Sequence, residues 1–401
     1  MEQNIRLYRT RWIVLSVFLF INLTIQLLWI SYAPITSIAA DFYGVKALQI
    51  GFLSMVFMIA FIPFSIPASW VIDTYGFRTG VSIAAVLLGV CGLLRGFAGA
   101  NFTLVLLSTI GLAIAQPFIL NAWTTLPAKW FSKNERATAV GLITLANLVG
   151  TAIGLVLTPI LAENNFTIPQ IQLMYGAIAA ISSVLFLLLA RENPPTPPCT
   201  EDETVRALML EGLKHAVSIG SFWIFIFISF LGLSIFNGIT TWVEAIIKPT
   251  GFSSVEAGML GDLMLHGGVI GAVVMPIFSD KTGRRKPFIQ LGVALSIPGL
   301  LGLAFFDTLI PLYLSAFSVG FFMISVSPIG MQYVSEITHP TPEGTSNGMI
   351  QLFGQASFVF VYIMEAMRTP AGSFAPSLLL AAGLLLVGLL LTSRMVETAR
   401  N

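Results

Sequence analysis

Long apolar segments recur along the whole chain, and no other feature of the sequence constrains its fold as strongly. A helix of about twenty apolar residues is long enough to cross the hydrocarbon core of a bilayer, which is about 30 Å thick. Segments of about this length lie at roughly 12–38, 48–72, 79–98, 102–127, 137–160, 172–190, 218–247, 255–278, 287–306, 309–333, 344–365 and 371–392. They form two groups of six, so the sequence predicts an all-α integral membrane protein with about twelve transmembrane helices in two six-helix, pseudo-symmetric halves. We expect the first segment to remain in the mature protein, because it is longer than the apolar core of a cleaved signal peptide.

Composition supports a membrane protein and excludes several other classes. Hydrophobic residues make up 56% of the chain and charged residues 10%, whereas about a quarter of the residues in a soluble domain are charged. The net charge of +1 leaves no basic field for a nucleic-acid partner. The sequence contains no phosphate-binding loop, no zinc-type spacing of His and Cys, and no cluster of Ser, His and Asp. It therefore predicts neither an enzyme nor an ATP-driven pump, and neither a cofactor nor a metal site.

One long polar stretch, residues 191–215, separates the two groups of apolar segments. Its proline cluster is typical of an extended linker. The sequence therefore predicts an N-terminal half at 1–190, a linker at 191–215 and a C-terminal half at 216–401. In this arrangement sixteen of the twenty Lys and Arg residues fall on one side of the membrane. The positive-inside rule puts both termini and the linker in the cytoplasm, and we expect a multi-pass protein of the cell membrane that works as a monomer.

An internal repeat follows the second segment of each half. The two turns have the sequences DTYGFR at 73–78 and DKTGRR at 280–285, so corresponding residues are 207 positions apart. Gly76 and Gly283 keep the same offset, and glycine permits a tight reversal of the chain. Parallel six-helix repeats are typical of transporters with a pseudo-two-fold axis along the membrane normal.

The charges of these two turns suggest a gating role. An Asp at the end of one helix and an Arg beyond the turn could pair with neighbouring helices and be released when the halves rock. The alternative is that they are ordinary charged loops under the positive-inside rule. The residues predicted to take part in gating are Asp73, Gly76, Arg78, Asp280, Gly283, Arg284 and Arg285.

Polar side chains form stripes at helical spacing on three of the predicted helices. A polar side chain in lipid needs a partner or a water-filled cavity, so three such stripes predict a polar cavity near the middle of the membrane. The alternative is that these side chains bond across packed helices. The indole in the first stripe is the best side-chain face for a quaternary ammonium or another organic cation. The stripes consist of Asn22, Gln26 and Trp29, of Asn237, Thr240, Thr241 and Glu244, and of Asn347, Gln351 and Gln355.

Three ionisable residues, Glu244, Asp262 and His266, lie inside predicted membrane segments. Asp262 and His266 are four residues apart and therefore share a helix face. Acids and histidines within a membrane are costly and often mark proton relays or cation sites. The three residues therefore suggest proton coupling or a carboxylate for a cationic substrate. The alternatives are that Asp262 and His266 form a structural pair, and that Glu244 lies at the membrane surface beside Lys248.

Several motifs resemble the major facilitator superfamily. PIFSDKTGRRKP at 276–287 is similar to its signature loop, DTYGFR to the degenerate first-half copy, and GTAIGLVLTP at 150–159 to the Gly-rich fifth helix of many members. The resemblance covers the whole chain and implies the major facilitator fold. More narrowly, AQPFILNAWTTLPAKWF at 115–131 and PEGTSNGMIQLFGQ at 342–355 resemble the feline leukaemia virus subgroup C receptor family. Animal members of that family transport choline and ethanolamine and were first described as haem exporters.

The resemblance to this narrower family implies substrate-binding residues. Its members hold their substrate with a Trp on helix 1, a Gln on helix 4, a Tyr on helix 7 and a Gln on helix 11. By their places in the matching motifs, Trp29, Gln116 and Gln355 correspond to three of these. Asn237, next to Phe236, takes the place of the Tyr, which weakens the aromatic cage. The family segments carry apolar residues at the helix 8 positions of the ionisable pair.

The sequence as a whole predicts a secondary transporter that moves a small polar or cationic organic solute, such as choline or ethanolamine, by alternating access. The alternatives are a proton-coupled exporter of drugs or amphipathic metabolites, including haem-like ones, and a non-transporting membrane sensor on a carrier scaffold. Intact signature turns in both halves argue against the sensor. We expect a small-molecule substrate, membrane lipids and, in the coupled case, protons as partners. The predicted substrate-binding residues are Gln26, Trp29, Gln116, Asn237, Thr241, Gln351 and Gln355.

Overall fold

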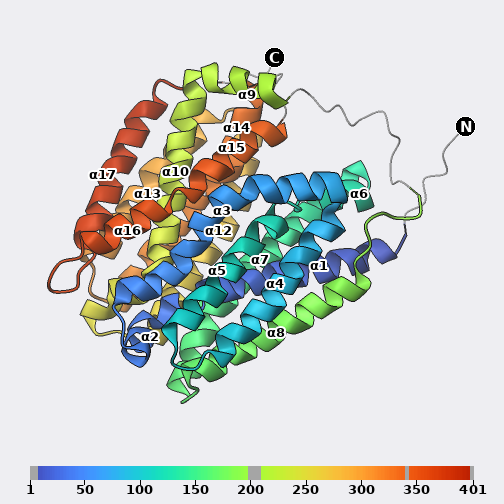
Figure 1. Ribbon diagram of the computed structural model, residues 1–401. Helices are drawn as coiled ribbons and strands as arrows, with labels where there is room; N and C mark the ends of the chain where they lie inside the picture. The colour runs from blue at the N-terminus through green and yellow to red at the C-terminus, as the bar shows by residue number, and fades with distance from the viewer. Residues whose placement is uncertain (1–7, 197–208, 339–342, 398–401) are drawn as a thin grey trace, which may run out of the picture. The chain divides into compact units, whose positions relative to one another are not determined.

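Helices make up the regular secondary structure in the part of the chain that the computed structural model describes, residues 8–196, 209–338 and 343–397 (Figure 1). Twelve helical spans over these residues are long and apolar enough to cross a membrane. This confirms the predicted all-α membrane fold and its number of spans. Lipid offers no partner for a backbone N–H or C=O, so each span satisfies most of these groups within its own helix.

The chain divides into two compact units, residues 1–205 and 206–401, and each is described by itself. The predicted limits of the two halves, at residues 190 and 216, stay a prediction. Positions 197–208 of the predicted linker lie outside the described residues, and its end belongs to helix α9 (Met209–Ser218).

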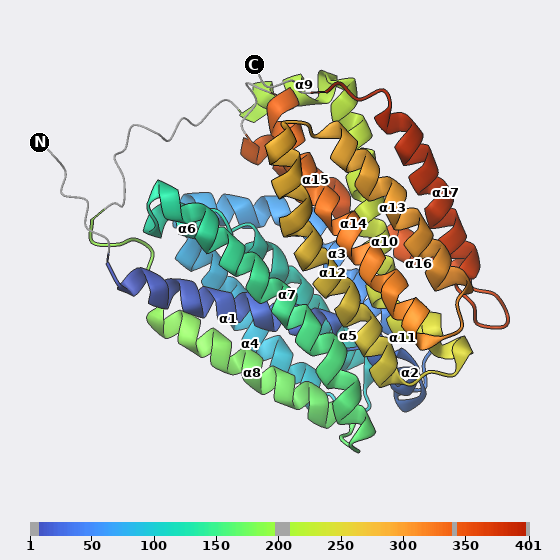
Figure 2. The ribbon, with the colours of Figure 1, turned by 180° about the vertical axis from the view of Figure 1, so that it is seen from behind.

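Unit 1 holds the first six spans. Its elements are α1 (Thr10–Ile30), the 3-10 helix η1 (Ala33–Ile35), α2 (Thr36–Tyr43), α3 (Ala47–Tyr75), α4 (Phe77–Phe97), α5 (Phe102–Leu120), α6 (Thr125–Trp130), α7 (Lys133–Glu163) and α8 (Ile168–Leu189). α4 packs against α5 and α8, α3 packs against α5, and α1 runs beside α7 and α8 (Figures 1 and 2). The contact of α1 with α7 is close, because a Cβ on Gly150 would overlap the carbonyl of Leu23. Small residues at such contacts are typical of membrane helices.

Unit 2 holds the last six spans. After α9 it contains α10 (Gly220–Thr241), α11 (Val243–Ile247), the 3-10 helix η3 (Lys248–Thr250), α12 (Ser254–Thr282), α13 (Lys286–Phe305), α14 (Leu309–Ile337), α15 (Glu343–Gln355), α16 (Phe358–Ala366) and α17 (Ala375–Thr392). α12 packs along α14, and α13 packs against α14 and α17. A Cβ on Gly320 of α14 would overlap the carbonyl of Met264 in α12. This pair therefore also depends on a small residue for its close approach.

Four helices end at a break with a shorter helix beyond it in the described residues, and the breaks after α1 and α15 lie inside a candidate span. α1 ends at Ile30, α5 at Leu120, α10 at Thr241 and α15 at Gln355, and a shorter helix follows each of them. In the first case Pro34 has no N–H to donate to the carbonyl of Ile30, which favours a break in the helix there. All seven predicted substrate-binding residues lie within four positions of one of these ends. Interrupted spans are where transporters commonly place substrate and coupling-ion sites.

Candidate functional site

Trp29 is fixed at the end of α1 by reciprocal hydrogen bonds with Ser54 of α3. Its indole Nε1 donates to the Ser54 carbonyl over 3.2 Å, and the Ser54 hydroxyl donates to the Trp29 carbonyl over 3.4 Å. The side chain is 8% exposed. Because the indole N–H is already bonded, the aromatic face is the part of this side chain that remains for a ligand.

Gln26 and Gln116 are buried but uncommitted. Gln26 lies one turn before Trp29 on α1, Gln116 lies on α5, and both are less than a tenth exposed. Within residues 8–196, neither amide makes a hydrogen bond. A buried amide without a partner is costly, so these two groups are suited to bond water or a polar solute.

Asn22, in the same stripe, has a different role. Its Nδ2 donates to the Phe18 carbonyl over 2.8 Å, and its Oδ1 accepts from the indole Nε1 of Trp123 over 2.5 Å. Trp123 belongs to the interruption between α5 and α6. Asn22 therefore ties α1 to that interruption, which is the interhelical bonding that the sequence left open as the alternative.

In unit 2 some of the predicted binding residues make side-chain hydrogen bonds and others do not, within the described residues. Asn237 donates from Nδ2 to the Ser357 hydroxyl over 2.9 Å, which connects α10 to the interruption before α16. The Thr241 hydroxyl is buried and has no partner among the described residues. Gln355 is half-buried and Gln351 exposed, and neither amide is bonded in the described part of unit 2. The side chain of Asn347 lies outside the described residues.

The ionisable residues of unit 2 lie in two different surroundings. Glu244 is buried in the short helix α11. On α12, His266 Nδ1 lies 3.2 Å from Asp262 Oδ2 and 2.9 Å from the Asp262 carbonyl. The His266 side chain is 62% exposed, on the same side of the helix as exposed Ile270 and Ile277. Asp262 and His266 are therefore paired with each other at an open face of α12.

The first signature turn is closed by an acid that the sequence analysis did not single out. Glu192, just after α8, accepts from the backbone N–H groups of Phe77 and Arg78 over 3.2 and 2.7 Å and caps the start of α4. Its carboxylate also pairs with Lys129 of α6. Gly76 has φ +93°, and a Cβ there would overlap the Glu192 carboxylate.

The second turn is closed in the same way but has a buried arginine at its centre. Glu397, after α17, accepts from the backbone N–H of Arg285 over 2.9 Å. The Arg285 guanidinium bonds to Asp280, to the Ser279 hydroxyl over 3.1 Å, and to Glu336 over 3.2 Å. Burial works to lower the pKa of Arg285, but the bonds to Asp280 and Glu336 outweigh it and raise the pKa above its ordinary value.

The predicted gating residues therefore fall into three groups: an ion pair, two glycines and three exposed side chains. Asp280 and Arg285 contact each other, and Gly76 and Gly283 both have positive φ. The remaining three are exposed at the surface of their turns: Asp73, Arg78 and Arg284. A signal that could have found Glu192 and Glu397 is that an acid follows the last helix of each half at nearly the repeat offset.

In unit 1, an ion pair also joins the starts of α1 and α7. Arg11 donates from Nη1 and Nη2 to the two carboxylate oxygens of Glu135 over 2.8 and 2.9 Å. The Ser132 hydroxyl also donates to Glu135, over 2.8 Å. This hydroxyl and the Arg11 charge lower the pKa of Glu135 below its ordinary value.

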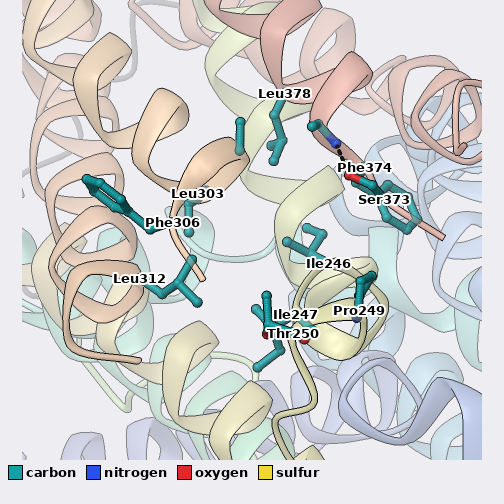
Figure 3. A pocket seen from close by; sticks show the side chains of 12 residues that line it. Ile246, Ile247, Pro249, Thr250, Leu303, Phe306, Leu312, Ser373, Phe374 and Leu378 are labelled. Carbon is teal, nitrogen blue, oxygen red and sulfur yellow. Dashed lines mark hydrogen bonds between the residues drawn. The ribbon is translucent and has the colours of Figure 1, made fainter. Parts of the chain in front are cut away.

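A small cavity of about 70 Å³ lies in unit 2 where α11 and η3 meet the ends of α13, α14 and α17 (Figure 3). Its lining includes Ile246, Leu303, Phe374 and Leu378. None of the predicted site residues lines it. A pocket for an organic solute is usually about 300 Å³ or more, so this cavity is not a substrate site.

Comparison with known families gives a match along nearly the whole chain. The Major Facilitator Superfamily matches residues 15–362 and 245–398. The choline/ethanolamine transporter flvcr2a of Danio rerio is 30% identical, over 97% of this chain and 87% of its own length. Solute carrier family 49 member A3 of Danio rerio is 29% identical, over 91% of this chain and 80% of its own. The human choline/ethanolamine transporter FLVCR2 is 27% identical, over 90% and 72% respectively.

Two solved structures share the fold. A bacterial homologue of the human lysosomal transporter Spinster, in an inward-facing and unoccupied conformation, gives a TM-score of 0.79 at 14% identity and covers 96% of this chain and 98% of its own. A mutant of the nucleoside transporter NupG gives 0.72 at 14% identity and covers 95% and 99%. At this identity the likeness concerns the fold alone.

Proposed function

Because the chain belongs to the major facilitator superfamily and, within it, to the feline leukaemia virus subgroup C receptor family, we propose that it carries a small polar or cationic organic solute of the choline and ethanolamine class by alternating access. Its relatives and its fold are those of transporters. The chain is therefore a multi-pass membrane transporter with a small-molecule substrate and not an enzyme, as the sequence predicts. We further propose that it works as a monomer in the cell membrane, among its lipids, with both termini in the cytoplasm.

The proposal depends most on the fixed indole of Trp29 and on two buried amides without hydrogen bonds in the described part of unit 1, that of Gln26 one turn before Trp29 on α1 and that of Gln116 on α5. A quaternary ammonium binds to an aromatic face, and the hydroxyl or amine of such a solute bonds to a free amide. Choline carries a quaternary ammonium and a hydroxyl, and ethanolamine carries a primary ammonium and a hydroxyl. The names of the flvcr2a and FLVCR2 relatives give the same two solutes for those proteins.

Taken by itself, unit 2 offers polar groups for the solute at its predicted binding residues and no aromatic face among them. Asn237 stands where the family resemblance implies a Tyr, and its amide is already bonded to Ser357. The hydroxyl of Thr241 and the amides of Gln351 and Gln355 are the groups we assign to the solute here. We expect a quaternary ammonium to bind more weakly than it would in a site with two aromatic faces.

Proton coupling is the second candidate, and the Asp262 and His266 pair favours it. A carboxylate and an imidazole in contact within a membrane span are the kind of pair that proton relays use. Such coupling fits an exporter of drugs or amphipathic metabolites, including haem-like ones, with Glu244 as a further acid. A sensor without transport activity has less support, because both signature turns keep their bonded structure.

The first experiment is thermal stabilisation of the purified protein in detergent by choline, ethanolamine, betaine and haem, because a ligand that binds the folded state raises its apparent stability. We expect choline to raise the melting temperature of the wild type and not of Trp29→Ala. Trp70→Ala is the matched control, since Trp70 is an exposed indole of the same unit. A choline shift that survives in Trp29→Ala would contradict the assignment of the indole.

Uptake into proteoliposomes separates the two candidates. A choline carrier without coupling takes up choline at the same initial rate with and without an imposed pH gradient. A proton-coupled carrier responds to the gradient, and we expect Asp262→Asn to abolish that response. A protein that binds haem and not choline would favour the second candidate.

A further inference from the structure

Arg95 is a buried arginine without an acidic partner. It lies in the last turn of α4, inside a candidate membrane span, and is 1% exposed. Its Nη1 donates to the Leu28 carbonyl and its Nη2 to the Ser31 hydroxyl, each over 2.9 Å. The guanidinium lies 4.4 Å from the centre of the Tyr32 ring. Over residues 8–196, no carboxylate pairs with it.

Burying a guanidinium at this position costs desolvation free energy. A buried cation without an anion keeps much of its desolvation cost, and the Nε of Arg95 has no partner among the described residues. A methionine of similar size would fill the space without that cost. The contribution of Arg95 is therefore the geometry that its two directed bonds impose.

These bonds are made to the interrupted end of α1. The last four carbonyls of a helix have no N–H donor from the next turn, and here Pro34 has no N–H to donate to the Ile30 carbonyl. Arg95 supplies a donor to Leu28, and its charge complements the negative end of the helix dipole. Ser31, which accepts from Arg95, donates in turn to the Leu28 carbonyl over 3.2 Å. The interruption is thus held by a bonded network.

A third helix joins the network through Gln172 of α8. Its Nε2 donates to the Ser31 hydroxyl over 3.4 Å, while its buried Oε1 has no partner in the described part of the chain. Arg95 Nε is an unpaired donor and Gln172 Oε1 an unpaired acceptor, and both side chains bond the same hydroxyl.

Trp29 lies between the two residues that Arg95 holds. The Leu28 carbonyl belongs to the peptide that leads into Trp29, and Ser31 follows two positions later. Ser54 binds the Trp29 carbonyl and indole from α3. The indole is therefore oriented by α3 on one side and, through the backbone, by α4 on the other.

We infer that Arg95 is a positioning residue for the solute site: its bonds to Leu28 and Ser31 at the end of α1 set the orientation of Trp29. The inference rests on the proposed function in one respect, namely that Trp29 contacts the solute. Arg95 itself does not touch the solute. Its removal therefore weakens binding through the mobility of the α1 end.

The test compares three variants of the full-length protein in detergent. Arg95→Met keeps the volume and removes both bonds, and Arg95→Lys keeps the charge but reaches one acceptor at a time. Tyr175→Phe is the control, because it removes a buried bond to Thr158 within the same unit without touching the end of α1. Hydrogen exchange of the backbone amides from residue 28 to 36 reports on the α1 end and requires no solute. Choline affinity, measured by calorimetry, reports on Trp29.

We expect exchange at 28–36 to be about ten-fold faster in Arg95→Met than in the wild type. Arg95→Lys should be intermediate, and Tyr175→Phe should be unchanged there even if its melting temperature falls. Choline should bind about ten-fold more weakly to Arg95→Met and with wild-type affinity to Tyr175→Phe.

Unchanged exchange at 28–36 in Arg95→Met overturns the inference. Faster exchange with unchanged choline affinity also overturns it, because the α1 end would then not set the orientation of the indole. If the wild type itself does not bind choline, the proposed substrate is wrong. The exchange measurement then decides the positioning of the α1 end by itself.

Discussion

The two signature turns share a backbone plan but use opposite charges to hold it. In each, a glycine with positive φ ends a long helix, and an acid from beyond the last helix of the unit caps the next one. The difference lies at two positions 207 residues apart, Lys129 on α6 and Glu336 on α14. Lys129 pairs with the capping acid of its own turn, whereas Glu336 pairs with the turn arginine, Arg285.

This difference explains why corresponding arginines have different surroundings. Arg78 corresponds to Arg285, but its neighbouring helix carries the cation Lys129 and offers no anion, so Arg78 stays exposed. In unit 2 the anion Glu336 draws Arg285 into a buried position. The repeat has therefore kept the backbone hydrogen bonds and exchanged the ion pairs around them.

Substituting the two turn glycines should have the largest effect on stability and tests whether the two turns share one backbone arrangement. Gly76→Ala should lower the free energy of unfolding by about 3 kcal/mol, since φ +93° and ψ 160° suit glycine alone and a Cβ would displace Glu192. Gly283→Ala should cost about 1 kcal/mol, because its φ of +64° lies in the ordinary left-handed region. Denaturant unfolding in detergent measures both. Equal losses would mean that the two turns are strained alike.

Reversing the charge at Glu336 disrupts the ion pair with Arg285 in unit 2. Glu336→Lys places a cation against buried Arg285 and should lower the free energy of unfolding by about 2 kcal/mol, less than for a fully buried pair because Glu336 is partly exposed. Asp307→Lys makes the same charge change at an exposed position of unit 2 and is the control. A loss no greater than that of the control would show that Glu336 does not stabilise Arg285.

Removing the cation at Lys129 should have a smaller effect. The Lys129 and Glu192 side chains are about a third exposed, and such pairs are worth about 0.5 kcal/mol and are screened by salt. Lys129→Met leaves Glu192 bonded to the start of α4. We expect a loss of this size in low salt that disappears in high salt. A loss as large as that of Glu336→Lys would mean that the capping acid depends on its cation.

The smallest effect concerns the Arg11 and Glu135 pair. The pKa of Glu135 is lowered in the folded state, so the pair contributes stability above the ordinary value of 4.5 and loses it as the pH falls through the lowered pKa. Melting temperatures of the wild type and Glu135→Gln should therefore differ at pH 7 and converge once the pH falls below the lowered pKa of Glu135. A difference that persists at low pH would assign it to packing and not to charge.

The sequence predicted the spans and the repeat because both rest on local patterns. Segment length fixes the number of spans, and the glycine in each signature turn marks the same reversal. The acids Glu192 and Glu397 were missed, because a polar residue beyond a helix end gains its role only when the chain folds back onto a distant turn. Nothing in the local sequence distinguishes such a residue from an ordinary loop acid.

The binding residues could be predicted only as groups. Asn22 and Gln26 have the same chemistry and share a helix face, yet Trp123 bonds to Asn22, while the Gln26 amide makes no hydrogen bond within residues 8–196. Arg95 was an exception to the positive-inside pattern, and its role depends on a partner 67 positions earlier in the chain. Pairings at such distances follow from packing, which periodicity does not encode.

The closure of each signature turn within its own unit has a consequence for protein engineering. The bonds described above for Glu192 and Lys129 lie before residue 197, and those described for Glu397, Glu336 and Arg285 lie after residue 208. Neither turn requires a covalent connection between the two halves. Two separately synthesised polypeptides, divided in that interval, would each bring a complete turn to a reassembled carrier.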